Sequence, residues 1–289
     1  MAKGKRVGKQ RPSTKKRKSA RKQSVRSAGG VSRRGVERSS DAIRIVPIAA
    51  PRELFPHVAN VPAAPPPSLT YRGGPLLAAV QVFCLYIGSA WSSGELETLA
   101  GKIDAFFGSI LESALIDQLS EYNVPKLAIK HGAFVSSTLV SSSAPSTSVT
   151  DAWVRKVLKQ AIAAGWPVPR PGLDVLYFVY LPPGVTLVQG GARSCQSFCG
   201  YHDSIDGKIF YAAMPYPNCA GCLGSLSVLD ALTSTSSHEL CEAITDPVPG
   251  TGWYDDANGE IADICAWQTK QIGAYSVQLE WSNARNACR

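Results

Sequence analysis

The stretch SSHELCEAITDP, from Ser236 to Pro247, holds the residues of this chain whose types and spacing best suit metal chemistry. On a helix, His238 and Glu242 lie four positions apart, so their side chains share one face and can bind one metal ion. The stretch matches the HExxH signature of zinc peptidases except at its last position, where Glu replaces His. In such enzymes the Glu after the first His accepts a proton from water that the metal has made more acidic. The pattern therefore predicts a metal-dependent hydrolase in which Glu239 is the base.

A third metal ligand is expected from the acidic stretch GWYDDANGEIADIC, residues 252–265. Glu260 follows His238 by 22 residues, which leaves enough chain for the helix to end and for a second element to return beside the metal. We favour Glu260 as this ligand. Asp263 is the second candidate, either as a ligand or as a hydrogen-bond partner of His238. Asp246, at the end of the helix, is the third.

The stretch CGYHD, residues 199–203, is expected in a loop and supplies two more candidates. His202 is a candidate ligand or oxyanion stabiliser, and Tyr201 is a candidate oxyanion stabiliser. One His with two carboxylates is a harder ligand set than two His with one Glu. The likeness to HExxH favours one zinc ion, and the harder ligand set makes manganese and calcium the alternatives. The competing interpretation is an ordinary charged face of a surface helix that binds no metal.

The elements that must position these residues alternate between strands and helices. Apolar runs predict buried strands at 76–88, 174–182 and 207–215, and short strands at 127–131 and 133–140. Helical spacing predicts a helical segment after Ser93, divided at Gly108, and a helix at 151–164 that Thr150 caps. A long helix carries the metal motif and ends at Pro247. This order predicts an α/β or α+β domain with a mixed sheet.

Charge and composition divide the 289-residue chain into a tail, a linker and one globular domain. Residues 1–40 carry 15 Lys and Arg and one acidic residue, a balance of +14, whereas residues 41–289 carry 15 basic and 21 acidic residues, a balance of −6. The tail has almost no large apolar side chains, so we expect it to be disordered and able to bind a polyanion such as nucleic acid or acidic polysaccharide. Residues 41–70 are rich in Pro and Ala and predict a linker. The domain is then expected at 71–289.

Eight cysteines, four of them between residues 195 and 222, favour disulfides and an extracellular, oxidising environment. No signal peptide is evident, however, because no continuous apolar core follows the basic start. The apolar run from Pro75 to Trp91 is too short and too interrupted to predict a transmembrane segment.

The cysteine spacing leaves two structures open. Cys195, Cys199, Cys219 and Cys222 suit either a structural zinc site or disulfides between two loops, and the sequence does not decide the pairing. A bridge between Cys241 and Cys265 would hold the third-ligand segment against the helix. The alternative is that Cys241 only packs in the core.

The motifs FCGYHD, IFYA, CAGC, SSHELCEAITDP, GWYDD, GEIADIC and EWSN together resemble a family of bacterial proteins. That family is in turn similar to the plant EXORDIUM or phosphate-induced proteins, which carry a CGYH-like stretch, a SHELAE-type helix and an EIGDLC-type segment. The resemblance covers roughly residues 71–288. It implies a zincin-like domain, an extracellular location and a site made of His238, Glu239, Glu242, Glu260, Asp263 and His202.

Three functions follow from these observations. The first is a zinc metallopeptidase that acts on a peptide or protein, with the strand at 208–214 as the sheet edge that pairs with an extended substrate. The second is a non-catalytic extracellular binding or signalling protein, in which the site holds a structural ion or disulfides brace the fold. The third is a polyanion-binding protein that acts through residues 1–40.

Overall fold

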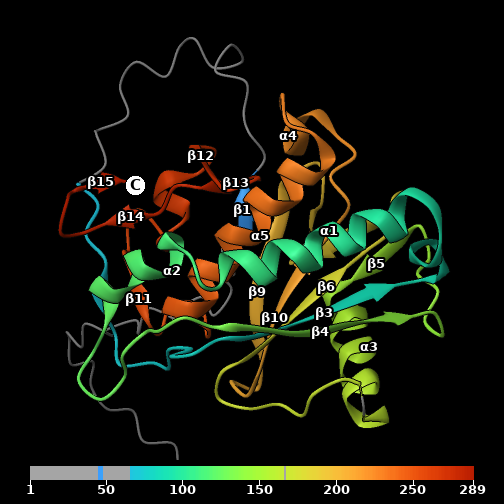
Figure 1. Cartoon of the computed structure of the whole chain (residues 1–289), viewed down its shortest axis with the longest axis horizontal. Helices are drawn as coiled ribbons and strands as arrows, with labels where there is room; N and C mark the ends of the chain where they lie inside the picture. Colours follow the sequence, from blue (N-terminus) through green and yellow to red (C-terminus); the bar gives the residue numbers. More distant parts are fainter. Residues whose placement is uncertain (1–44, 48–65, 166) are drawn as a thin grey trace, which may run out of the picture. The chain divides into compact units, whose positions relative to one another are not determined.

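In a computed structural model, the described residues, 45–47, 66–165 and 167–289, form a mixed α+β fold. Strands β10, β6, β3 and β4 of the main sheet run parallel, whereas β9 is antiparallel to β10 and β1 is antiparallel to β9 (Figure 1). The predicted mixed sheet is therefore confirmed. The six strands lie in the order β1 (Ile45–Pro47), β9 (Phe198–Ile205), β10 (Ile209–Met214), β6 (Val175–Tyr180), β3 (Gln81–Ile87) and β4 (Ala133–Val140).

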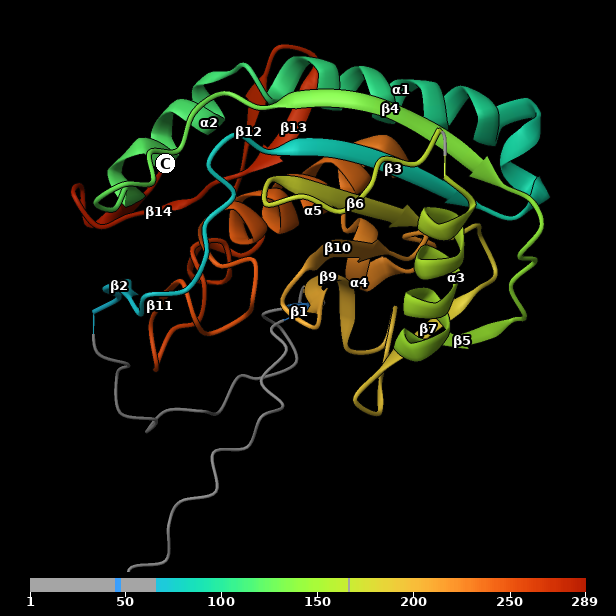
Figure 2. The ribbon, with the colours of Figure 1, turned by 90° about the horizontal axis from the view of Figure 1, so that it is seen from below.

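Helices cover both faces of the main sheet (Figure 2). Helices α1 (Gly94–Ile110) and α5 (Val228–Thr245) pack on one face, and α3 (Asp151–Ala164) packs on the other. Because successive residues of a strand point to opposite faces, each strand contributes to both cores. In β6, Phe178 and Tyr180 join the core with α1 and α5, while Tyr177 and Val179 join the core with α3.

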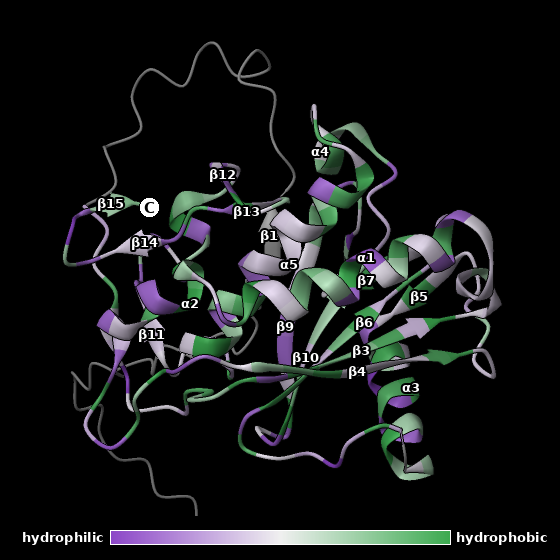
Figure 3. Cartoon of the chain, in the orientation of Figure 1, coloured by the Kyte–Doolittle hydropathy of each residue, from purple (hydrophilic) through white to green (hydrophobic). Residues whose placement is uncertain are grey.

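Helix α5 carries the metal motif and is buried on all sides. The side chain of Ser227 caps its start by accepting a hydrogen bond from the backbone of Asp230. Every residue from 231 to 245 is buried, although the middle of the helix is polar. Figure 3 shows this contrast, with green on much of the sheet and white and purple stretches on α5. The surface location in the competing interpretation is therefore wrong, because this face of α5 is buried.

The remaining elements are short and lie around these layers. Three two-stranded sheets pair β11 with β2, β12 with β13, and β14 with β15, and one three-stranded sheet has the order β5, β7, β8. Within the described ranges, no helix combines the length and the apolar character needed to cross a membrane. The bounds are β2 (Thr70–Tyr71), η2 (Ser89–Ser92), α2 (Ala114–Gln118), η3 (Leu119–Tyr122), β5 (Ser148–Thr150), β7 (Thr186–Gln189), β8 (Ala192–Arg193), α4 (Ala220–Leu223), β11 (Trp253–Tyr254), η4 (Asp263–Cys265), β12 (Thr269–Ile272), β13 (Tyr275–Gln278), β14 (Trp281–Ser282) and β15 (Ala287–Cys288).

Three local predictions differ from the structure. The stretch CGYHD is not a loop, because it forms most of β9, whose eight residues are all buried. The helical segment breaks at Ser113, not at Gly108, because the Ser113 side chain accepts a hydrogen bond from the backbone of Leu115 and so starts α2. Residues 127–131 form no named strand in this described part of the chain.

The N-terminal predictions fall largely outside the described residues. The basic tail, 1–40, lies entirely outside them, as do residues 48–65 of the predicted linker. Within that linker, Ile45–Pro47 forms β1 and pairs with β9, in a register that sets Val46 opposite Gly200. The sheet therefore includes three residues that precede the expected start of the domain at residue 71.

Three disulfides settle the alternatives for the cysteines. Cys195 pairs with Cys219 and Cys199 with Cys222, which ties the start of β9 to α4, so these residues form no zinc site. The third disulfide joins Cys265 to Cys288, which decides against the alternative of a Cys241–Cys265 bridge. Cys241 has a free, buried thiol and only packs in the core, as does Cys84.

Candidate metal centre

Four parts of the chain bring the candidate ligands together on one side of the main sheet. Helix α5 presents His238, Glu239 and Glu242, and β9 presents His202. The segment between β11 and η4 supplies Glu260, and η4 begins with Asp263. The side chains of both histidines and all three glutamates are at most 1 % exposed, and that of Asp263 is 12 % exposed.

Glu242 lies at the middle of the cluster, with one carboxylate oxygen near each histidine. His238 Nε2 is 2.9 Å from Glu242 Oε1, and His202 Nδ1 is 3.3 Å from Glu242 Oε2. The ligand atoms fall into two sets of three, each set lying within 4.8 Å. One set is His238, Glu242 and Asp263; the other is His202, Glu242 and Glu260. The candidate ligand that the structure places beside His238 and Glu242 is thus Asp263, the second candidate from the sequence, while Glu260, the first, lies with His202.

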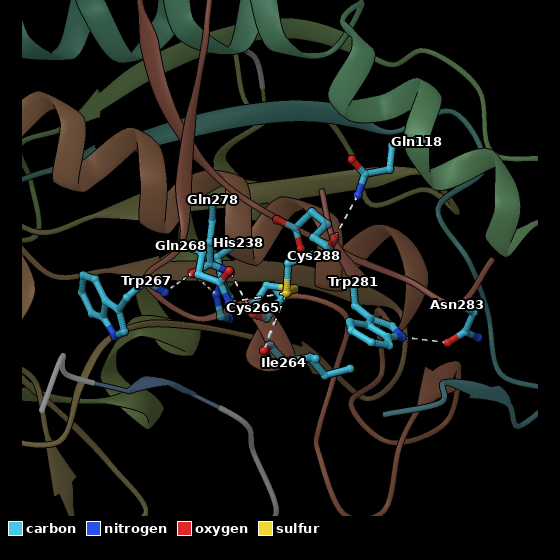
Figure 4. Close-up of a disulfide and its surroundings, with 12 residues drawn as sticks. Gln118, His238, Ile264, Cys265, Trp267, Gln268, Gln278, Trp281, Asn283 and Cys288 are labelled. Carbon is cyan, nitrogen blue, oxygen red and sulfur yellow. Dashed lines mark hydrogen bonds between the residues drawn. A yellow bond between two sulfur atoms is a disulfide. The ribbon is translucent and has the colours of Figure 1, made fainter. Parts of the chain in front are cut away.

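The hydrogen bonds of Gln278 fix the orientation of the His238 ring. The Gln278 side chain donates from Nε2 to the carbonyl of Ala262 at 2.8 Å, which turns its oxygen, Oε1, toward His238 Nδ1 at 3.0 Å (Figure 4). Nδ1 must then carry the proton that is donated to Oε1. In the neutral ring, this leaves the lone pair on Nε2, the nitrogen that faces Glu242.

His202 is held in a similar way. Its Nε2 lies 3.1 Å from the backbone carbonyl of Asp246, which can only accept a hydrogen bond. Its Nδ1 faces Glu239 Oε2 at 3.2 Å as well as Glu242. Both imidazoles therefore have one nitrogen fixed by a neutral acceptor, but in His202 this nitrogen, Nε2, also lies 3.5 Å from Glu260 Oε1.

Several buried atoms of the centre make no hydrogen bond, and this tests whether a cation fits. Within the described residues, the unpartnered atoms include His238 Nε2 and both carboxylate oxygens of Glu242 and of Glu260. A buried polar group without a partner costs about 1–3 kcal/mol, and a charged one costs more. Imidazole nitrogen and carboxylate oxygen are the donor atoms that zinc and manganese accept. The residues therefore fit a divalent cation.

The pKa values in the metal-free protein show how strongly these groups interact. Burial would lower the pKa of His238, but Glu242 outweighs it and raises that pKa to about 10. Burial would raise the pKa of Glu242, but His238 and His202 outweigh it and lower that pKa to about 2. Burial, and then the charge of Glu242, raise the pKa of Glu260 well above its ordinary value.

The structure does not bring Tyr201 or Asp246 into the centre as ligand or oxyanion stabiliser. Tyr201 points to the opposite face of β9 from His202, because adjacent strand residues alternate, and its hydroxyl donates to Asp151 Oδ1 at 2.8 Å. This corrects its expected catalytic role. The Asp246 carboxylate instead accepts backbone hydrogen bonds from residues 250, 251 and 252 and so shapes the turn after α5.

Two glycines permit the close packing of the centre. A Cβ on Gly200 would lie 2.8 Å from Thr235 Cγ2 and 3.1 Å from Glu239 Oε1, so β9 approaches α5 where no side chain fits. Gly259 has a positive φ of 94°, and a Cβ there would lie 2.2 Å from Asp263 Oδ2. The same oxygen accepts a hydrogen bond from the backbone of Glu260 at 3.1 Å.

The sequence reasoning missed Gln278 and the correct partner of Cys265. Figure 4 shows the Cys265–Cys288 disulfide close to His238 and Gln278. Gln278 lies 40 residues from His238. The alternation in YSVQ was the available signal, because it predicts a strand with Gln278 and Ser276 on one face.

Comparison with known proteins adds no further constraint. No protein-family model, no curated protein and no solved structure matches this chain. The resemblance to EXORDIUM-like proteins therefore rests on the motifs given above, and the candidate function rests on the geometry of the centre.

Proposed function

We propose that this chain binds a divalent metal ion, zinc first, and acts as a metal-dependent hydrolase of peptide bonds on a zincin-like domain. The ion is held by His238, Glu242 and Asp263. The observation that carries the proposal is the convergence of buried imidazole and carboxylate atoms that have no hydrogen-bond partner among the described residues. In the metal-free protein these atoms are linked by ion pairs of 2.9–3.5 Å between the histidines and the glutamates, and a bound cation would take the place of the proton on each imidazole.

Glu239 is the residue that would move the proton. A bound zinc ion supplies a Lewis acid that polarises a substrate carbonyl and makes water more acidic. Glu239 Oε1 has no hydrogen-bond partner in the described residues, while Oε2 faces His202 Nδ1. Burial raises the pKa of Glu239, which makes its carboxylate a stronger base than that of an exposed glutamate.

A peptidase function requires that an extended substrate can reach the buried centre. The strand at 208–214, expected at the sheet edge, forms β10 in the interior of the sheet, between β9 and β6. The edge on this side belongs to β1, which pairs with β9 at Gly200, beside Glu239. An extended substrate that adds to β9 would take the place of β1.

The burial of the centre favours one alternative, a structural ion in a non-catalytic, EXORDIUM-like binding protein. Its most exposed ligand is Asp263, whose side chain is only 12 % exposed. A structural metal site is closed, whereas a catalytic site keeps an open position for water or substrate. The two functions differ in what Glu239 does, and that difference can be measured.

The deciding experiment compares Glu239→Gln with the wild type and with Glu280→Gln, a buried glutamate outside both ligand sets. Metal content is measured by elemental mass spectrometry, and cleavage with a quenched-fluorescence peptide library. A hydrolase keeps its metal in both variants but loses about 10²–10⁴-fold in rate in Glu239→Gln alone.

The full chain and a chain without residues 1–47 are assayed together, since the shorter one lacks β1. Bound metal without cleavage by either chain would establish the structural ion instead. Absence of bound metal would refute both functions and leave a fold braced by its three disulfides.

A further inference from the structure

The two oxygens of Glu242 face two different sets of ligands. Oε1 lies 2.9 Å from His238 Nε2, whose set also includes Asp263. Oε2 lies 3.3 Å from His202 Nδ1, whose set also includes Glu260. Each set thus has one imidazole, one carboxylate of its own and one oxygen of the shared carboxylate.

One ion at this centre does not account for both histidines. Zinc binds imidazole nitrogen at about 2.0–2.1 Å, so two nitrogens on the same ion lie at most about 4.2 Å apart. Among the described residues, no group of ligand atoms within 4.8 Å contains both His202 and His238. The His202 set therefore remains without a cation when an ion occupies the His238 set.

The His202 set has the features of a prepared site. Both oxygens of Glu260 are buried and have no hydrogen-bond partner among the described residues, and the same is true of Glu242 Oε2. His202 Nε2 lies 3.1 Å from the carbonyl of Asp246 and 3.5 Å from Glu260 Oε1, while Nδ1 lies 3.3 Å from Glu242 Oε2, so the ring stands between the two carboxylates of its set. A carbonyl that is hydrogen-bonded to one ring nitrogen is the usual support of a metal-ligating histidine.

The charge of the cluster is matched by two divalent cations. When both sets hold an ion, the imidazoles are neutral and the carboxylates of Glu239, Glu242, Glu260 and Asp263 carry four negative charges. Two divalent ions balance all four of them. In a buried environment, uncompensated charge is strongly unfavourable.

We propose that the centre is binuclear, with a second divalent cation bound by His202 and Glu260 and with Glu242 bridging the two ions through its two oxygens. The inference rests on the proposed metal site at His238 and extends it. Paired metal ions about 3.5–4 Å apart occur in hydrolases, where they act on both the attacking and the leaving oxygen.

The test measures metal stoichiometry and magnetic coupling on the full chain. The protein is purified without thiol reductant, so that the disulfide sulfurs are not ligands, and is loaded with Mn²⁺ alone. Elemental mass spectrometry should find two Mn²⁺ per chain in the wild type and in Glu280→Gln. His202→Ala and His238→Ala should each hold one. Electron paramagnetic resonance should show a spin-coupled pair in the wild type and an isolated ion in either histidine variant.

Other results would overturn the second site, the proposed function or the bridge by Glu242. One ion in the wild type, kept in His202→Ala and lost in His238→Ala, overturns the second site but leaves the proposed function standing. No bound metal overturns both. Two ions without spin coupling overturn the bridge by Glu242. If a histidine variant does not fold, the stoichiometry and the spectrum of the wild type still decide the question.

Discussion

The substitution Glu260→Gln should have opposite effects on stability in the absence and in the presence of metal. Gln has nearly the same volume as Glu, so the packing is retained. Both carboxylate oxygens of Glu260 are buried and make no hydrogen bond within the described residues. The fold by itself therefore gains nothing from a negative charge at this position. A bound cation, in contrast, is stabilised by that charge.

The pH dependence follows from the raised pKa of Glu260. Burial and the neighbouring charge of Glu242 raise that pKa well above its ordinary value of 4.5. The folded, metal-free protein thus retains a proton that the unfolded chain releases above about pH 4.5. The free energy of unfolding then falls as the pH rises from there until the folded-state pKa is passed. Gln carries no such proton, so the variant lacks this loss of stability.

The expected gain comes from this linkage alone, because the Gln amide is as polar and as buried as the carboxyl that it replaces. About 1 kcal/mol shifts the Tm of a domain of this size by about 2–4 °C. In EDTA at pH 8, Glu260→Gln should therefore melt at least about 2 °C above the wild type. With zinc at 100 times its Kd for the His202 set, the wild type gains about 2.7 kcal/mol from this second ion, and Glu260→Gln, which lacks a ligand of that set, does not gain it.

The assay is thermal and urea unfolding, followed by circular dichroism, at pH 6 and pH 8, with EDTA or with zinc. Glu280→Gln is the matched control, because Glu280 is also fully buried with two unpartnered oxygens but belongs to neither ligand set. It should keep the full response to zinc. The reasoning is refuted if Glu260→Gln destabilises the EDTA-treated protein, or if zinc stabilises it as much as it stabilises the control.

Three further perturbations test the supports of the centre. Gln278→Leu removes the acceptor for His238 Nδ1 and should weaken zinc binding about 10–100-fold in chelator competition; unchanged binding would count against this role of Gln278. Replacing both Cys265 and Cys288 with Ser removes a disulfide between residues 23 positions apart. The free energy of unfolding, measured with urea, should fall by about 3 kcal/mol; an unchanged urea midpoint would mean that this disulfide does not stabilise the fold. Gly200→Ala places a methyl group 2.8 Å from a side chain of α5 and should destabilise by about 1–3 kcal/mol; a neutral result would mean that β9 and α5 separate easily.

Much of the fold could be predicted because its signals are local. The apolar runs at 174–182 and 207–215 became β6 and β10, and Thr150 caps α3 as its position before an amphipathic stretch indicates. Strand β9 escaped prediction because its residues, FCGYHDSI, are mostly polar or small. Their partners, among them Glu239, lie far along the chain, and burial follows from those contacts rather than from composition.

The sequence by itself determined that His238, Glu239 and Glu242 share one helix and that a second acidic stretch follows, because helical spacing is a property of neighbouring residues. Only the tertiary structure decided that α5 is buried, that Asp263 joins His238, and that Glu260 joins His202. It also decided the disulfide pairs. These outcomes depend on side chains that lie tens of residues apart in the chain, and the packing of β9, α5 and η4 against one another selects among them.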